Sequence, residues 1–330
     1  MISKPHMVNA AKFRELGLLV FIVLLVGFIQ LRNPRFLTSE NLNDMIVNAS
    51  ILGALTVGMM MVMITGGIDL SIGAVIALSG MAAALVVRDI PTTSAVTALI
   101  IGTVTGCVCG FISGLIVAKG KVLALIATLG MMNVYRGLTY LIAKGAWVSA
   151  YQMNPGFEAL ALGKILGLNN LVWVALIIFI VAYYFLTYTR TGRRVYAVGS
   201  NVEAARISGI DVDRILIMVY TIMGTICGLC GVLWVSKYAS AQGDTALGYE
   251  MTVIAACVIG GVSVSGGSGK VQGVFLGAVL LGVLKQALPM LKVSPFWQDA
   301  IYGFIILIAV VLNTYFKRTV DWDTLQRRKI

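Results

Sequence analysis

Long apolar runs separated by short polar stretches occupy the chain from residue 16 to residue 316. Each run is close to the about 20 residues that an α-helix needs to cross a bilayer. The runs do not alternate apolar and polar positions, as the strands of a membrane β-barrel would. The pattern therefore predicts an all-α, polytopic transmembrane helical bundle with about ten spans. The expected spans are 16–31, 45–65, 68–87, 94–118, 123–142, 171–188, 215–236, 251–264, 271–289 and 298–316.

Composition supports this interpretation and narrows the class of protein. The chain is 59% hydrophobic and only 12% charged, with a mean hydropathy of +0.93. Soluble domains carry roughly 25% charged residues, and disordered chains are poor in apolar residues. Ten spans would use about 200 residues, which leaves no segment long enough for a soluble catalytic domain. We expect a single transmembrane domain over residues 1–330.

The distribution of charge predicts the orientation of the chain in the membrane. The formal net charge is +11, from 25 Lys and Arg against 14 Asp and Glu. With both termini in the cytoplasm, cytoplasmic segments would hold 16 of the 25 basic residues, as the positive-inside rule favours. The main cytoplasmic segments are then the N-terminus 1–15, the loop 189–214 and the tail 317–330. No basic stripe with interleaved aromatic residues indicates a nucleic-acid partner.

Glycines recur at every fourth position in the expected span 94–118, at Gly102, Gly106, Gly110 and Gly114. This spacing places them on one face of a helix, where a second helix can approach closely. The pair Gly224 and Gly228 repeats the pattern in span 215–236. We expect tight packing between helices at these positions.

The first candidate functional motif is GGIDLSIG at 66–73, where two glycines break an apolar run. Asp69 and Ser71 stand where a new helix begins, and such residues accept hydrogen bonds from the free backbone N–H groups of a first turn. One interpretation is a capped helix break near the cytoplasmic face. The other is that the buried acid lines a polar pathway or gate.

The loop 189–214 contains a second candidate. Ser200 or Asn201 can cap a short helix, Glu203 falls in its first turn, and Gly209 is a natural stop. A helix of about seven residues is not stable alone in water and needs a surface to pack on. That surface is either the lipid headgroups or a cytoplasmic protein partner.

Polar residues inside or beside the spans form a third candidate set. Asn133 and Arg136 lie within the span 123–142, and Gln242 and Glu250 precede the span 251–264. A buried Arg is costly unless it is paired or hydrated. Arg136 either reaches the outer interface or an acid such as Glu250, or it lines a solute cavity. With Asp69 and Ser71, these residues are the candidate translocation path.

Several ordered motifs resemble those of the inner-membrane permease subunits of bacterial ABC importers for monosaccharides. They are GGIDLSIG at 66–73, ATLG at 127–130, YRG at 135–137, GRRVYAVGSNVEAAR at 192–206, SGI at 208–210, YE at 249–250, AACVIGG at 255–261 and GGSG at 266–269. The ribose, xylose, rhamnose and autoinducer-2 permeases belong to this group. The resemblance runs from about residue 45 to 316 and specifies the family far better than the sugar.

The resemblance implies a set of partners. The permease would pair with a second copy or a paralogue. A cytoplasmic ABC ATPase subunit would bind one face, and a periplasmic or lipid-anchored sugar-binding protein would deliver the sugar to the other. The 200–210 segment resembles the loop that couples the permease to its ATPase. The residues implied in this contact are Asn201, Glu203, Ala204, Ala205, Arg206 and Gly209.

The sequence indicates no nucleotide-binding, metal-binding or catalytic site in this chain. Gly269-Lys270 is followed by Val271, where a nucleotide-binding P-loop requires Ser or Thr. The C-x-x-C of Cys227 and Cys230 lies in an apolar run, and the single histidine is His6, so a metal site is not indicated. We expect a transport subunit rather than an enzyme, without catalytic residues, metal or bound cofactor. The rival interpretation is an ion-coupled secondary sugar transporter, which would need acids at mid-membrane depth.

Overall fold

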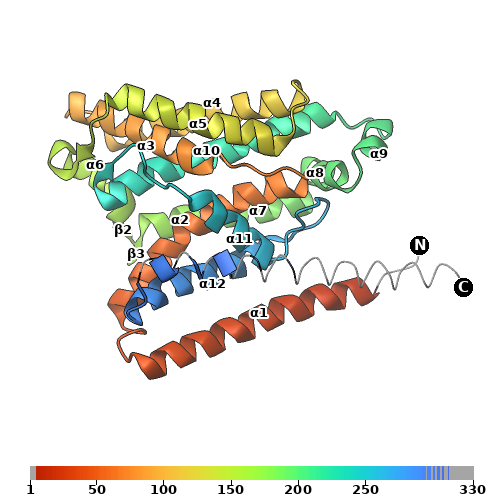
Figure 1. Cartoon of the computed structure of the whole chain (residues 1–330), viewed down its shortest axis with the longest axis horizontal. Helices are drawn as coiled ribbons and strands as arrows, with labels where there is room; N and C mark the ends of the chain where they lie inside the picture. Colours follow the sequence, from red (N-terminus) through yellow and green to blue (C-terminus); the bar gives the residue numbers. More distant parts are fainter. Residues whose placement is uncertain are drawn as a thin grey trace, which may run out of the picture.

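The computed structural model describes residues 5–294, 296–298, 300–301, 303–304, 307 and 311, with side chains described from residue 15 onward. The described residues form a bundle of long α-helices that run along a common direction (Figure 1). This architecture confirms the predicted all-α polytopic bundle.

Seven described helices are long and apolar enough to cross a membrane. They are α1 (Pro5–Arg32), α2 (Ser39–Ile64), α3 (Ile72–Asp89), α4 (Ala95–Ala118), α7 (Asn170–Tyr188), α10 (Val212–Tyr238) and α12 (Val271–Met290). An eighth helix, α5 (Ala124–Ala143), has the 20 residues that a span requires. It lies alongside α3 and α4 (Figure 1). These eight helices coincide with eight of the predicted spans.

The two remaining predicted spans have different outcomes. The predicted span 251–264 is in the structure a shorter helix, α11 (Tyr249–Ile259), of 11 residues. It is about 16 Å long and cannot cross the hydrocarbon core alone. Its length is limited by Gly260 and Gly261, since Gly261 adopts a φ of +83°. The predicted span 298–316 lies largely outside the described residues, so the total of ten stays a prediction.

Short elements gather at the two ends of the bundle (Figure 1). One end, which we call the strand end, carries two antiparallel pairs and two short helices. These are β1 (Val148–Ser149) with β4 (Ser240–Ala241), β2 (Lys164–Ile165) with β3 (Leu168–Asn169), the 3-10 helix Ala150–Gln152, and α6 (Pro155–Leu162). The opposite end, which we call the basic end, carries α8 (Arg190–Ser200), α9 (Val202–Ile207) and the turn between α4 and α5.

The glycine stripe of α4 is confirmed as a packing face against α10. A Cβ atom added at Gly106 would lie 2.3 Å from the carbonyl oxygen of Gly224 and 2.5 Å from Cα of Gly228. Gly110 would clash in the same way with the backbone at Tyr220 and Gly224. Because real Cβ atoms do not approach backbone so closely, only glycine permits this helix separation.

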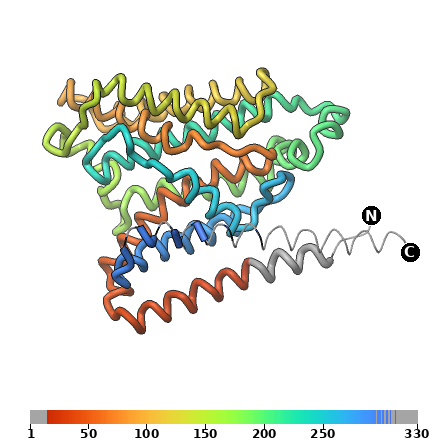
Figure 2. Tube along the Cα trace, viewed as in Figure 1, coloured from red at the N-terminus to blue at the C-terminus, as the bar shows by residue number. Residues whose placement is uncertain are grey.

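The helices differ in how much of their apolar surface is buried, and this difference reflects whether a helix lies at the centre or the edge of the bundle. In α2, 78% of the residues in its most apolar 18-residue stretch are buried, and the helix packs against α7, α10, α11 and α12. In α1 the corresponding share is 11%. This helix packs on α12 and otherwise stands apart from the bundle (Figure 2). Its exposed leucines and valines are suited to lipid contact.

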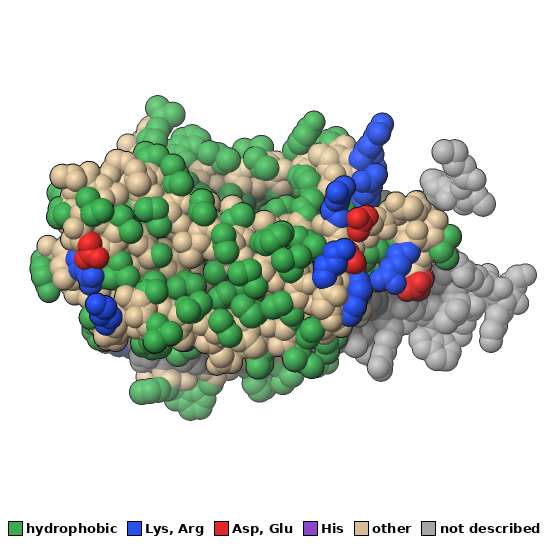
Figure 3. Space-filling view, turned by 90° about the horizontal axis from the view of Figure 1, so that it is seen from above, with side chains coloured by type: hydrophobic (Ala, Val, Ile, Leu, Met, Phe, Trp, Pro, Cys, Tyr) green, Lys and Arg blue, Asp and Glu red, His purple; other side chains and the backbone are tan. Residues whose placement is uncertain are grey.

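The face of the molecule seen in Figure 3 has a wide hydrophobic region between two polar ends. Basic and acidic side chains gather at the ends, and apolar side chains cover the region between them (Figure 3). This distribution matches a protein whose middle lies in lipid. Glu15 of α1 accepts a hydrogen bond from Lys270, 3.1 Å away, so residue 15 lies near the basic end. The predicted cytoplasmic tail 317–330 lies outside the described residues.

Candidate functional site: a docking helix and a broken polar segment

Two short helices form in the loop 189–214 because capping residues start each one. The Thr189 hydroxyl accepts a hydrogen bond from the backbone N–H of Gly192 at 2.9 Å. Asn201 Oδ1 accepts one from the N–H of Ala204, also at 2.9 Å. Gly209, at a φ of +77°, follows the end of α9. The predicted cap and stop of α9 are confirmed. Helix α8 was not among the predicted elements. Its sequence signal is the capping residue Thr189, followed by a helix face with few apolar residues.

Helix α9 presents most of its surface to the outside at the basic end. Glu203 and Arg206 form an exposed ion pair of 3.3 Å across one turn. Ala205 alone among the predicted docking residues is buried, so it fixes the helix to the bundle. Asn201, Ala204 and Gly209 are exposed. Ile207, which is not among the predicted docking residues, is 87% exposed and adds an apolar side chain to this polar surface.

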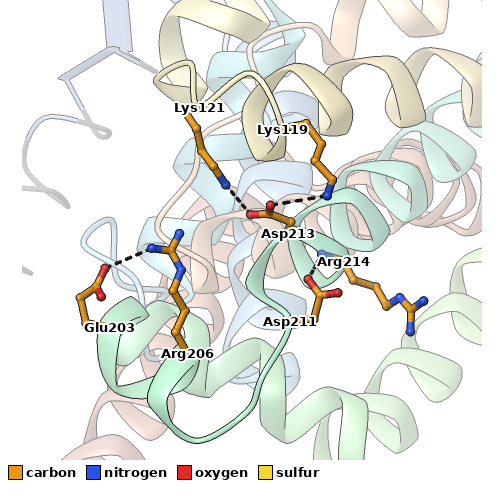
Figure 4. Close-up of polar contacts among 7 residues, drawn as sticks. All are labelled: Lys119, Lys121, Glu203, Arg206, Asp211, Asp213 and Arg214. Atoms are coloured by element: carbon orange, nitrogen blue, oxygen red, sulfur yellow. Dashed lines mark hydrogen bonds and ion pairs between the residues drawn. The ribbon is translucent and has the colours of Figure 1, made fainter.

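A charged cluster lies beside α9 where α10 begins (Figure 4). Asp213, in the first turn of α10, lies 2.6 Å from Lys121 Nζ and 3.8 Å from Lys119 Nζ. Asp211 caps α10 by accepting a hydrogen bond from the N–H of Arg214 at 3.0 Å. A shallow depression beside α9 is lined by Lys121, Arg206, Ile210, Asp211, Val212 and Asp213. The start of α10 is thus fixed to the α4–α5 turn by ion pairs, and it follows α9 after a short connecting segment.

Helix α8 rests on a glycine turn that precedes α12. The Tyr196 hydroxyl donates to the carbonyl of Gly269 at 2.9 Å, and burial raises the pKa of this phenol. Gly266 and Gly267 both adopt positive φ, so the GGSG motif forms a tight turn. The N–H of Gly267 donates to the carbonyl of Ile64 at 2.8 Å. The basic end of α2, α8 and the start of α12 therefore form one packed unit.

Asp69 serves the backbone locally at the break between α2 and α3. It is 3% exposed, and its Oδ1 accepts from the N–H of Ser71 at 2.8 Å and from the Ser71 hydroxyl at 2.6 Å. Thr128 of α5 accepts a hydrogen bond from the N–H of Leu70 at 3.1 Å, a contact that the sequence did not reveal. Asp69 thus closes a local turn before α3, whereas the Ser71 side chain, at the N-cap position, accepts no hydrogen bond from the first turn of that helix. A role of Asp69 and Ser71 in a pathway stays a prediction.

A second irregular segment, residues 239–248, links α10 to α11. Arg136 holds it by donating through one guanidinium nitrogen to the carbonyls of Gly243 and Thr245, at 2.8 Å each. Among the described residues, Arg136 forms no ion pair with Glu250 within 4.0 Å, unlike one of the two expected arrangements. The guanidinium is instead satisfied by backbone oxygens, which makes it a clamp on this segment.

Glu250 lies where the first turns of two helices meet. It is 8% exposed, in the first turn of α11. A Cβ added at Gly73, in the first turn of α3, would lie 2.8 Å from Glu250 Oε2. Helix N-termini carry a partial positive charge that favours a carboxylate. The missing side chain of Gly73 therefore makes room for this acid.

Among the described residues, the six predicted pathway residues form no hydrogen bond or ion pair with one another except between Asp69 and Ser71. Arg136 of α5 contacts the segment 239–248, Glu250 follows that segment in α11, and Gln242 within it donates to Ser240 at 2.9 Å. Asp69 and Ser71 lie at the other break. Asn133 is exposed on α5 and donates to the carbonyl of Leu129 in its own helix at 3.0 Å. Within the described residues, no group of three His, Cys, Asp or Glu side chains could hold a metal ion.

Comparison with known proteins places the chain in a family. Residues 41–310 match the family described as branched-chain amino acid transport system / permease component. The chain belongs to this family of permease components. It is a transport subunit rather than an enzyme, and the seven apolar helices make it a multi-pass membrane protein. No solved structure matches the chain.

The similar proteins include named sugar permeases of bacteria. The chain is 38% identical to the ribose import permease protein RbsC of Escherichia coli K12, over 94% of this chain and 97% of the relative. It is 38% identical to RbsC of Bacillus subtilis over 91% and 92%. It is 34% identical to the L-arabinose ABC transporter permease protein AraH of Azospirillum brasilense over 91% and 87%. The resemblance to monosaccharide permeases is thereby confirmed.

Proposed function

We propose that this permease is the membrane subunit of an ATP-driven importer that moves a monosaccharide across a bacterial inner membrane. The observation that carries the proposal is α9, a capped helix of six residues that exposes Glu203, Arg206 and Ile207 at the basic end. An exposed apolar residue beside charges suits a protein partner better than headgroups alone. That partner is a cytoplasmic ABC ATPase subunit.

The relatives favour a pentose as the substrate. They are named for ribose and for L-arabinose, while deoxyhexoses and autoinducer-2-like sugars remain in the range of the resembling family. A periplasmic or lipid-anchored binding protein would deliver the sugar at the strand end. A second permease copy or a paralogue would complete the path. The chain would bind no cofactor, since ATP hydrolysis takes place on the partner.

The packing supports a mechanism of alternating access. Movement of α9 would pass to the start of α10, because Asp211 and Asp213 stand in the short connection between the two helices and in the first turn of α10. Helix α10 would carry α4 with it, because glycine backbones of the two helices interlock. Rigid motion of one packed group against another is a common switching mode. The irregular segments 65–71 and 239–248 would change shape as the path opens.

The first test is co-purification of the tagged chain from a mild detergent, followed by mass spectrometry. An ABC ATPase should accompany the wild type and be lost from the double variant Glu203→Ala, Arg206→Ala. The matched control is Arg88→Ala, Asp89→Ala, which removes an exposed ion pair of 2.8 Å at the end of α3. Retention of the ATPase by the α9 variant would contradict the docking role. Absence of any ATPase from the wild type would contradict the importer.

A second test separates the proposal from an ion-coupled transporter. In sealed proteoliposomes that hold the permease with its ATPase and are loaded with ATP, enclosed orthovanadate should stop uptake of labelled sugar delivered by the binding protein, whereas a protonophore alone should leave this uptake intact. The reverse result would establish the ion-coupled alternative.

A further inference from the structure

Aromatic and basic side chains gather near the strand end, where α2, α10, α11 and α12 come together. This outer cluster consists of Asn48, Trp234, Lys237, Tyr238, Tyr249 and Lys285. Tyr238 is the last residue of α10, and Lys285 lies one to two turns before the end of α12. None of these six residues was among the predicted pathway positions.

The aromatic rings of the cluster form one continuous wall. The ring of Trp234 lies 5.3 Å from that of Tyr238 and 5.0 Å from that of Tyr249, the latter edge to face. Tyr249 is 8% exposed and forms the back of the wall, whereas Tyr238 is 47% exposed. A solute can therefore reach the rings of Tyr238 and the half-buried Trp234 from outside.

Two ammonium groups flank this wall. Lys237 donates to the side-chain oxygen of Asn48 and lies 4.8 Å from the ring centre of Tyr238. Lys285 lies 4.9 Å from the ring centre of Tyr249. Over the part of the chain that the structure describes, neither lysine has a carboxylate within 4.0 Å. Unpaired ammonium groups on spanning helices mark a hydrated, functional position.

We propose that the outer cluster is the first contact site for the sugar within the permease. This inference rests on the proposed function and adds the place where the solute enters. Accessible aromatic rings suit the C–H faces of a sugar ring. A few fixed polar groups, here two ammonium groups and one amide, provide donors and an acceptor for hydroxyls. Two like charges would repel cationic solutes. An ammonium group can donate a hydrogen bond to the hydroxyl oxygen of a neutral solute, so the solute needs no charge of its own.

The test uses the full-length permease in nanodiscs of phosphatidylcholine, without binding protein or ATPase. Leu247, two residues before Tyr249 and 72% exposed, is replaced by cysteine as a reporter. Labelling of Leu247→Cys by a membrane-impermeant maleimide should slow by about three- to tenfold in saturating D-ribose or L-arabinose. The unsubstituted chain, whose cysteines at the described positions are buried or half-buried, supplies the background rate.

Second-site variants identify the surface that the sugar covers. Protection should be lost with Tyr238→Ala and Lys285→Gln, and kept with Tyr238→Phe, which retains the ring. The control Tyr184→Ala removes a 64% exposed tyrosine from α7 and should keep protection. If Tyr238→Ala does not fold, as judged by its thermal unfolding, the Lys285→Gln variant decides the result.

Other ligands define what would overturn the proposal. Protection by D-gluconate, or by phosphatidylglycerol in the nanodisc, but not by either neutral sugar would identify an anion or lipid site instead. Protection that persists in Tyr238→Ala and Lys285→Gln would place the sugar elsewhere. Loss of the ATPase from co-purification would contradict the proposed function and leave this binding result unchanged, so the two failures are distinguishable.

Discussion

Lys121 Nζ lies 2.6 Å from Asp213 Oδ1 and thereby joins the turn between α4 and α5 to the first turn of α10 (Figure 4). The lysine side chain is 57% exposed and the aspartate 23% exposed. The two residues are 92 positions apart in sequence. The bond therefore adds an ionic contact at the basic end between α10 and the turn that follows α4, the two helices whose glycine backbones pack closely.

The first prediction concerns this ion pair. Lys121→Met should lower the free energy of unfolding by less than about 1 kcal/mol, because exposed ion pairs are screened by water and salt. Sugar uptake per ATP hydrolysed should nevertheless fall, since α10 is held less firmly to the α4–α5 turn. Uptake and ATPase rates of the reconstituted complex measure this ratio. The neighbouring Lys119→Met, whose lysine is 3.8 Å from Asp213, is the control and should have the weaker effect. Equal ratios for wild type and Lys121→Met would refute the mechanical link.

The second prediction tests the glycine contact of α4 and α10. Gly106→Ala should destabilise the protein by about 1–3 kcal/mol, because its Cβ would lie 2.3 Å from the Gly224 carbonyl oxygen. Gly130→Ala on α5 is the matched control, since a Cβ there meets no atom within 4 Å. That change should be neutral or stabilising by up to about 1 kcal/mol, as alanine favours a helix. Thermal unfolding in detergent compares the two, and similar shifts would contradict the close packing.

The third prediction concerns Thr128 at the break between α2 and α3. Thr128→Val keeps the side-chain shape but leaves the buried N–H of Leu70 without its partner at 3.1 Å. A loss of about 1–3 kcal/mol in the free energy of unfolding is expected. Thr103→Val is the control, because the Thr103 hydroxyl donates to Leu99 in its own helix, as Thr128 also does to Ala124. Equal losses in both variants would show that Thr128 does not support the break.

The fourth prediction treats Arg136 as the clamp on the irregular segment before α11. Arg136→Gln removes the positive charge. A hydrogen bond from a charged group contributes about 1.5–3 kcal/mol to the free energy of unfolding. Amide hydrogen exchange at residues 242–248 should accelerate, and sugar uptake should fall. Arg136→Lys should restore part of the protection, because an ammonium can still donate to the carbonyls of Gly243 and Thr245. Unchanged exchange in Arg136→Gln would exclude the clamp.

The sequence alone determined the class, the spans and the local signals. The length of an apolar run is compared directly with the thickness of the bilayer, so eight of the predicted spans coincide with helices, seven of which are long and apolar enough to cross a membrane. The Asn201 cap and the Gly209 stop were also readable, because capping depends on residues within one helical turn. The glycine stripe predicted a close helix contact, because its spacing of four residues lies on one helix face.

Only the tertiary structure decided which partner each polar group meets. The carbonyls held by Arg136 are 107 and 109 residues away, and the lysines that contact Asp213 are more than 90 residues away. No local periodicity encodes such pairs. The same holds for the outer cluster, whose residues come from four helices. Within a span, the sequence shows that a polar residue needs a hydrogen-bond partner, but the packing of the helices determines which group that partner is.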